Sequence, residues 1–268
     1  MKVYLTSRIQ FSEFLFILLT LLIISLLQGC AIRSLYIPVS QNAPLFDSNK
    51  TIVGCAYLGT NHVELQGAYN PTKRVAVAAN INFGGGIAIY DLALGTYGHN
   101  RNQKWRYELF AGYGYNSNIT FPTTYSDLFS KQSINYEINS LYNKFYVQPA
   151  FGYFGEIKMY RLNYSFSLSS RFSYLNFSRF LYREIDVIKT IDPDNPVYII
   201  NRSYINKGIY LFEPCITNKV GINNLSGILQ LQAIIPYSEE IDLHDTKFSP
   251  GLLFSVGLQY RFQLKKRL

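Results

Sequence analysis

The chain has 268 residues, a formal net charge of +8 at pH 7 and an aromatic content of 16%, with 23 Tyr and 19 Phe against one Trp. Its basic residues form no block of the kind that binds nucleic acid, so we expect no nucleic-acid partner. Tyr favours a half-hydrated boundary between water and an apolar phase, and so many Tyr residues are unusual for a soluble domain. No linker-like shift in composition divides the chain after its start, which favours one domain.

The first element in chain order is an uncharged apolar run at 14–27, FLFILLTLLIISLL, preceded by the basic residues Lys2 and Arg8. This run is shorter than the roughly 20 residues that a membrane-spanning helix needs. A basic start, a short apolar core and a small residue before the break are typical of a secretory signal peptide, with a membrane anchor or a buried helix as alternatives. We therefore expect residues 1–29 to be a cleaved signal peptide.

The run ends in LQGC at 27–30, which resembles the lipobox of bacterial lipoproteins. In that family the cysteine sulfur receives a diacylglyceryl group, and cleavage leaves the acylated cysteine as the new N-terminus. The resemblance implies that Cys30 is lipidated, and that the protein lies in the outer membrane because Ala31 rather than Asp follows. Two or three acyl chains hold a protein on a membrane far better than one. Residues 30–50 are then a lipidated tether, which we expect at the periplasmic leaflet.

Beyond this tether the chain predicts β-strands, because apolar and polar residues alternate with the period of two that a strand requires. The clearest example is YRLNYSFSLSSRFSY at 160–174, which has one apolar face and one face of Arg, Asn and Ser. No convincing amphipathic helix appears after Cys30. We predict about ten strands, with eight as the alternative. The expected strands lie near 51–58, 62–69, 74–83, 87–97, 105–117, 142–154, 159–177, 207–222, 227–237 and 250–263.

Two architectures share this pattern: a soluble sandwich or lipocalin-like barrel has its apolar face inside, whereas a membrane barrel has it outside. Many of the strands reach the nine to eleven residues that cross a membrane at a tilt. Short connections also alternate with long ones near 118–141, 178–206 and 238–249, as in outer-membrane barrels. We therefore predict an all-β, antiparallel, up-and-down transmembrane β-barrel at 51–268, with the long connections as external loops.

The polar faces of these strands carry charges of both signs. Opposite charges inside a narrow barrel can cross-link its wall, whereas a charge buried without a partner is costly. We predict a structural network of charges in the barrel interior, and a catalytic or conducting set is the alternative. Its candidate members are Glu64, Asp91, Arg106, Glu108, Arg161, Arg171, Glu213, Lys219 and Arg261.

The last strand contains SVGLQYRF at 255–262, which looks like the C-terminal signal that outer-membrane barrels present to their assembly machinery. The matching positions are Ser255, Gly257, Tyr260 and Phe262. The whole mature chain also resembles a group of uncharacterised outer-membrane β-barrel lipoproteins of the Bacteroidetes type. This resemblance implies a fold and a location but no ligand or reaction. The similar stretches are YIPVSQNAPLF, ELQGAYNPT, YELFAGYGY, KFYVQPAFGY, YLFEPCITNKVGI and LLFSVGLQYRF.

No motif for catalysis or metal binding stands out. The three histidines, His62, His99 and His244, have no metal-pair spacing, and no nucleophile elbow or phosphate loop occurs. We therefore expect no metal and no cofactor. Cys55 and Cys215 could pair in an oxidising compartment, but unpaired side chains packed in strands are the favoured interpretation.

Several functions remain open. The leading one is a structural or surface-interaction barrel without catalysis, whose external loops near 118–141 and 178–206 make any contacts. The alternatives are a barrel enzyme acting on lipid or lipid A, with His99 or His244 as its base, a narrow pore, and a periplasmic lipocalin-like binding barrel. The expected partners are outer-membrane lipid and the lipoprotein-sorting and barrel-assembly machinery.

Overall fold

The computed structural model describes residue 36 and residues 39–48, 50–58, 63–84, 87–126, 132–157, 162–188, 198–204, 207–238 and 251–264. Eleven β-strands form within these residues. None of these ranges contains a helix that is long and apolar enough to cross a membrane. The predicted signal peptide, Cys30, Arg161, His62 and His244 lie outside the described residues.

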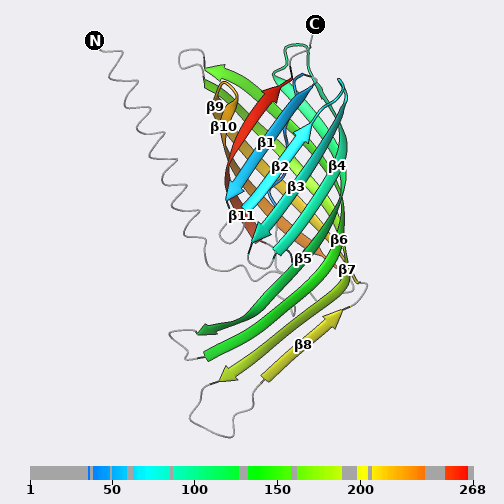
Figure 1. The fold of residues 1–268 in the computed structure, drawn as a ribbon, viewed down its shortest axis with the longest axis vertical. Helices are drawn as coiled ribbons and strands as arrows, with labels where there is room; N and C mark the ends of the chain where they lie inside the picture. The colour runs from blue at the N-terminus through cyan, green and yellow to red at the C-terminus, as the bar shows by residue number, and fades with distance from the viewer. Residues whose placement is uncertain are drawn as a thin grey trace, which may run out of the picture.

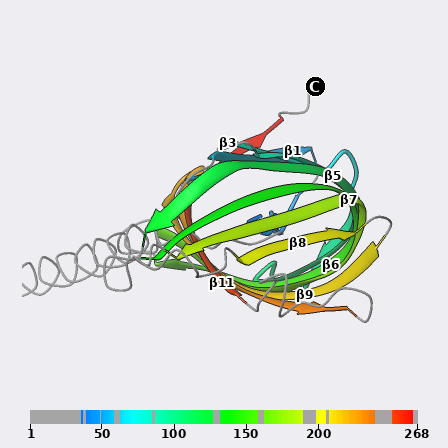
Figure 2. The same ribbon diagram turned by 90° about the horizontal axis from the view of Figure 1, so that it is seen from below.

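Ten of the strands close into an antiparallel barrel (Figures 1 and 2). Around the ring, β1 to β7 follow chain order, β7 pairs with β9, and β11 closes on β1. This confirms the predicted all-β, up-and-down barrel of ten strands. The strands are β1 Thr51–Leu58, β2 Val63–Tyr69, β3 Val75–Gly84, β4 Ile87–His99, β5 Trp105–Ser126, β6 Gln132–Ile157, β7 Leu162–Ile188, β8 Tyr198–Tyr204, β9 Lys207–Ile222, β10 Leu225–Tyr237 and β11 Gly251–Gln263.

The alternation in the sequence becomes two opposite faces of the barrel wall. In β4, Leu92 is 66% exposed and the preceding Asp91 is 5% exposed. The same contrast recurs in β7, where Phe172 points outward and its neighbour Arg171 is buried in the lumen. A soluble barrel has the reverse arrangement. The apolar side chains therefore cover the outside of this barrel, and its inside is polar.

The two ends of the barrel differ. At one end, tight turns such as residues 70–74, 100–104 and 223–224 join neighbouring strands; we call it the short-turn end. Asn223 has a φ of 54°, the left-handed conformation that Asn tolerates in a two-residue hairpin turn. At the other end β5, β6 and β7 run on beyond the barrel (Figure 1); we call it the protrusion end.

The protrusion is a four-stranded sheet. β5 loses its neighbour β4 after Asn118, and β7 loses its neighbour β9 after Phe177. Beyond these points β5, β6 and β7 stay paired, and β8 pairs with the far part of β7 over Phe180–Asp186. The expectation of loops at 118–141 and 178–206 is therefore wrong for most of both ranges. The third expected loop, 238–249, lies almost entirely outside the described residues.

Two irregularities explain why the sequence concealed these strands. Pairing of β6 with β7 shifts register between Leu141 and Tyr142, so that Ser178 is an extra residue on β7. Pairing of β5 with β6 shifts register between Thr120 and Thr123, a stretch that includes Pro122. A β-bulge adds one residue and inverts the alternation after it. A search for strict period two therefore begins one strand at 142 and ends the next at 177, beside the first bulge, and it ends the strand from 105 at 117, just before the second.

Candidate functional site in the barrel lumen

The lumen of the barrel contains the chain's own N-terminal segment, which we call the plug and define as Tyr36 and residues 39–48. The plug lies inside the ring of strands when the barrel is seen along its axis (Figure 2). Val39, Gln41, Leu45 and Phe46 are each completely buried. Protein therefore fills the lumen at the level of these residues.

The plug runs along the lumen from one end to the other. At the protrusion end, Tyr36 packs in a buried cluster with Tyr142 and Phe177, and its ring centroid lies 6.3 Å from that of Tyr142. At the short-turn end, Phe46 packs against Tyr97, with ring centroids 5.4 Å apart. The segment between them therefore passes through the polar middle of the barrel.

Cationic side chains of the wall donate hydrogen bonds to successive carbonyl oxygens of the plug. The Lys219 Nζ lies 2.8 Å from the Ala43 oxygen, Arg261 Nη2 lies 2.9 Å from the Pro44 oxygen, and Arg106 Nη1 lies 3.0 Å from the Leu45 oxygen. An extended segment without a strand partner would otherwise leave these carbonyls unsatisfied. The wall cations thus replace the hydrogen bonds that a β-ladder would supply.

Carboxylates of the wall do the same for the amide groups of the plug. The backbone N–H of Ser40 donates to Glu64 Oε2 at 3.0 Å, and that of Phe46 donates to Glu108 Oε1 at 2.8 Å. Gln230 makes both kinds of contact with Gln41, accepting from its N–H and donating to its carbonyl oxygen. Wall and plug therefore match group by group, which fixes the position of the plug along the barrel axis.

Glu213 joins the plug to three strands near the protrusion end. Its carboxylate is completely buried and accepts hydrogen bonds from Tyr36 Oη at 2.8 Å, Gln232 Nε2 at 2.9 Å and Ser173 Oγ at 3.2 Å. Hydrogen bonds to a buried carboxylate are stronger than those between neutral groups. Glu213 therefore holds Tyr36 in register with β7, β9 and β10.

Asp91 and Lys144 form a buried ion pair that involves only the wall. Lys144 Nζ lies 2.7 Å from Asp91 Oδ2, and both side chains are nearly inaccessible to solvent. Asp91 is on β4 and Lys144 on β6, and both pair in register with Gly114 of the intervening β5. A Cβ at position 114 would collide with the Asp91 carboxylate. The glycine thus leaves space for a contact that reaches across one strand.

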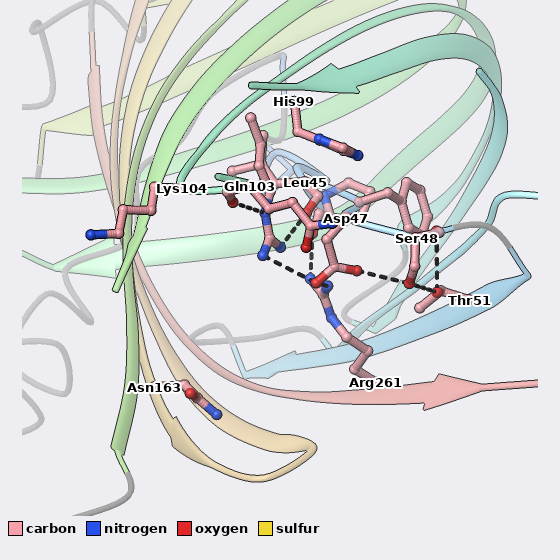
Figure 3. A network of polar contacts seen from close by, with 12 residues as sticks. Leu45, Asp47, Ser48, Thr51, His99, Gln103, Lys104, Asn163 and Arg261 are labelled. Atoms are coloured by element: carbon pink, nitrogen blue, oxygen red, sulfur yellow. Dashed lines mark hydrogen bonds and ion pairs between the residues drawn. The ribbon is translucent and has the colours of Figure 1, made fainter. Parts of the chain in front are cut away.

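The short-turn end has an open polar cavity of about 650 Å³. Asp47 lines this cavity and forms ion pairs with Arg106 at 3.0 Å and Arg261 at 3.2 Å (Figure 3). Burial alone would raise the pKa of Asp47, but the two guanidinium groups outweigh it and hold this pKa below its ordinary value of 3.8. Lys104 points away from the network in Figure 3.

Most of the candidate charged side chains contact the plug rather than one another. Seven of them are buried, and the side chain of Arg261 is 20% exposed at the short-turn cavity. Within the described residues only Asp91 forms an ion pair with another wall residue, and its partner Lys144 was not among the candidates. The buried candidates are Glu64, Asp91, Arg106, Glu108, Arg171, Glu213 and Lys219.

Other predicted positions have simpler surroundings. In β11, Ser255 faces the lumen and its Oγ lies 3.0 Å from that of Ser40, whereas Tyr260 and Phe262 point outward. Their role in assembly remains a prediction, as does that of Gly257 on the same strand. Cys55 and Cys215 are buried and unbridged, which agrees with the favoured interpretation. His99 is exposed at the short-turn end, with Nδ1 2.9 Å from the Asn100 oxygen.

The plug is the feature that sequence reasoning missed. Its sequence VSQNAPLFDS at 39–48 has no period of two or 3.6, so pattern analysis assigns it no structure. The sequence did contain one signal. The charged side chains of the wall need partners, and the sequence offered no scheme by which they could all pair with one another. Lys144 was also detectable, because it alternates with the outward-facing Phe145 and Val147.

Comparison of the sequence with protein-family models and with curated proteins finds no match. Function is therefore inferred from the wall, the plug and the protrusion. The wall has an apolar exterior, the plug fills the lumen with a segment of the same chain, and the protrusion extends beyond one end as a sheet.

Proposed function

We propose that this protein is a lipid-anchored outer-membrane barrel with a structural or surface-interaction role, in which the barrel holds the protrusion outside the membrane. The observation that carries the proposal is the apolar exterior of the ring. Large hydrophobic side chains cover it on the described strands, and water would make such a surface aggregate. A bilayer is the solvent in which an apolar exterior and a polar interior are both stable.

Aromatic residues on the exterior support the same proposal. Trp105 stacks on Phe151 and meets Tyr153 edge-on near the short-turn end. Tyr210 packs against Tyr174 on the barrel wall near the protrusion end. Aromatic girdles at both interfaces are typical of membrane barrels, because these rings have an apolar body and a polar edge. The short-turn end would then face the periplasm and the protrusion the outside.

A lipocalin-like binding barrel is disfavoured by the chemistry of the lumen. Such a barrel binds apolar ligands in an apolar interior, whereas buried Arg171, Glu213 and Lys219 line this one. The plug also occupies the space that a ligand would need. A narrow pore is disfavoured for the same reason. A barrel enzyme acting on lipid or lipid A is the other alternative, and His99, at the short-turn rim, is its candidate base among the described residues.

Heat-modifiable migration in electrophoresis tests the membrane barrel. Detergent-extracted protein should migrate differently with and without boiling, and mass spectrometry should find acyl groups on Cys30. In planar bilayers the intact chain should show no stable conductance. A water-soluble, unacylated product with one migration position would contradict the proposal, and stable conductance of the intact chain would contradict the structural role.

A further inference from the structure

We infer that the acyl chains on Cys30 insert at the protrusion end of the barrel, in the outer leaflet, rather than at the periplasmic leaflet that the sequence suggested. The inference rests on the proposed function, because it requires a membrane-embedded barrel and a lipidated Cys30. Its new content is the direction in which the N-terminus leaves the barrel. That direction follows from the plug.

The order of plug contacts fixes this direction. Tyr36 is at the protrusion end, where its hydroxyl donates to Glu213 and its ring packs near Phe177. Asp47 is at the short-turn end, paired with Arg106 and Arg261. The chain therefore enters the lumen at the protrusion end, crosses it, and starts β1 at the short-turn end. Any segment that precedes Tyr36 begins from the protrusion end.

The length of chain between Cys30 and Tyr36 limits where the lipid can be. These residues are six positions apart, and a fully extended chain of six residues spans at most about 22 Å. Tyr142, beside Tyr36, precedes the short-turn end of β6 at Ile157 by 15 residues. At roughly 3.3 Å per residue and a strand tilt of about 40°, this separation is roughly 40 Å along the barrel axis.

These lengths decide between the leaflets. The hydrocarbon core of a bilayer is about 30 Å thick, so a lipid within about 22 Å of Tyr36 does not reach the leaflet at the short-turn end. The route through the lumen is also filled by the plug itself. Among the described strands, β5, β6, β7 and β8 extend beyond the ring at the protrusion end, whereas β1, β2 and β3 do not (Figure 1). The lipid therefore enters the nearer leaflet.

This arrangement gives the lipid a function that a self-inserting barrel otherwise lacks. An acyl group anchored at the protrusion end holds the chain at the side where it enters the lumen. The ion pairs of Asp47 hold the plug at the opposite side. The plug is then fixed at both ends.

Cysteine labelling tests the topology without lengthening the segment. Cys55 and Cys215 are first replaced by Ala, and Ser34→Cys or Lys73→Cys is added as the single reactive thiol, since acylation consumes the Cys30 sulfur. Lys73 lies in the exposed turn between β2 and β3 at the short-turn end. Intact cells are treated with a large, membrane-impermeant polyethylene glycol maleimide, and a parallel sample is permeabilised first.

We expect Ser34→Cys to react on intact cells and Lys73→Cys to react only after permeabilisation. If both positions require permeabilisation, or both react on intact cells, the inference is overturned. Heat-modifiability and acylation are measured on the same variants, so that failure of this inference can be distinguished from failure of the proposed function. An embedded, acylated barrel with a protected position 34 would refute only the inference, whereas loss of embedding or acylation would refute the proposed function.

Discussion

The plug is held by different contacts at the two ends of the lumen. At the protrusion end, Tyr36 and its aromatic neighbours exclude water, and the buried pair of Asp91 and Lys144 lies in the wall nearby. At the short-turn end, Asp47 and its two arginine partners border an open polar cavity. Truncating a buried apolar side chain, or one partner of a buried ion pair, costs much stability. Exposed ion pairs contribute little, and their contribution depends on pH and salt. One plug thus has a tight end and an adjustable end.

The largest effect is expected for Lys144→Met, which leaves the Asp91 carboxylate buried without its partner. Breaking such a pair costs about 3–5 kcal/mol. Urea unfolding of the protein in lipid vesicles should show this loss of stability. Gly114→Ala should reproduce part of it, because the added Cβ displaces the carboxylate. The double replacement Asp91→Leu with Lys144→Met should recover most of the stability; failure to recover would mean that the pair is not an isolated unit.

A similar loss, about 3–5 kcal/mol, is expected for Tyr36→Ala, because a large buried aromatic side chain is removed from the cluster at the protrusion end. The N-terminal segment should become sensitive to protease in the embedded protein, while the barrel itself stays resistant. Tyr36→Phe keeps the ring and removes the hydroxyl that donates to Glu213, and it should lose less stability. Equal losses for both variants would show that the ring contributes nothing.

A smaller effect, about 1 kcal/mol, is expected for Asp47→Asn at the adjustable end, because its ion pairs are partly exposed. The expected readout is faster protease cleavage between the plug and β1, with unchanged protection near Tyr36. Lys73→Gln, which changes an exposed charge at the same end without a described contact to the plug, is the matched control. Loss of protection at both ends would mean that the plug moves as one body.

The smallest effect concerns pH. The pKa of Asp47 is lowered in the folded protein, so the ion pairs contribute fully above the ordinary value of 3.8 and are lost as the pH falls through the lowered value. The short-turn end should therefore loosen below about pH 4. Hydrogen exchange measured across this pH range would test this loosening, and Asp47→Asn should abolish its pH dependence.

The ring of strands was predictable because each strand carries its own signal. Alternation at 160–174 assigns Arg171 to the polar face of its strand without knowledge of any other strand, and this face lies inside the barrel. The plug was not predictable in the same way, because its conformation depends on side chains from many strands that meet only after the ring closes. The protrusion was concealed by bulges near Ser178 and Pro122, which break the period that reveals a strand.

A plug–wall cross-link would test whether the N-terminal segment occupies the lumen in the membrane. The Oγ atoms of Ser40 and Ser255 lie 3.0 Å apart, so Ser40→Cys with Ser255→Cys, in a chain whose Cys55 and Cys215 are replaced by Ala, should form a disulfide on mild oxidation. The bridged protein should migrate faster than the reduced one after boiling, while Ser40→Cys with Ser226→Cys should not. A heat-modifiable, embedded barrel that forms no Ser40–Ser255 bridge would contradict the plugged lumen.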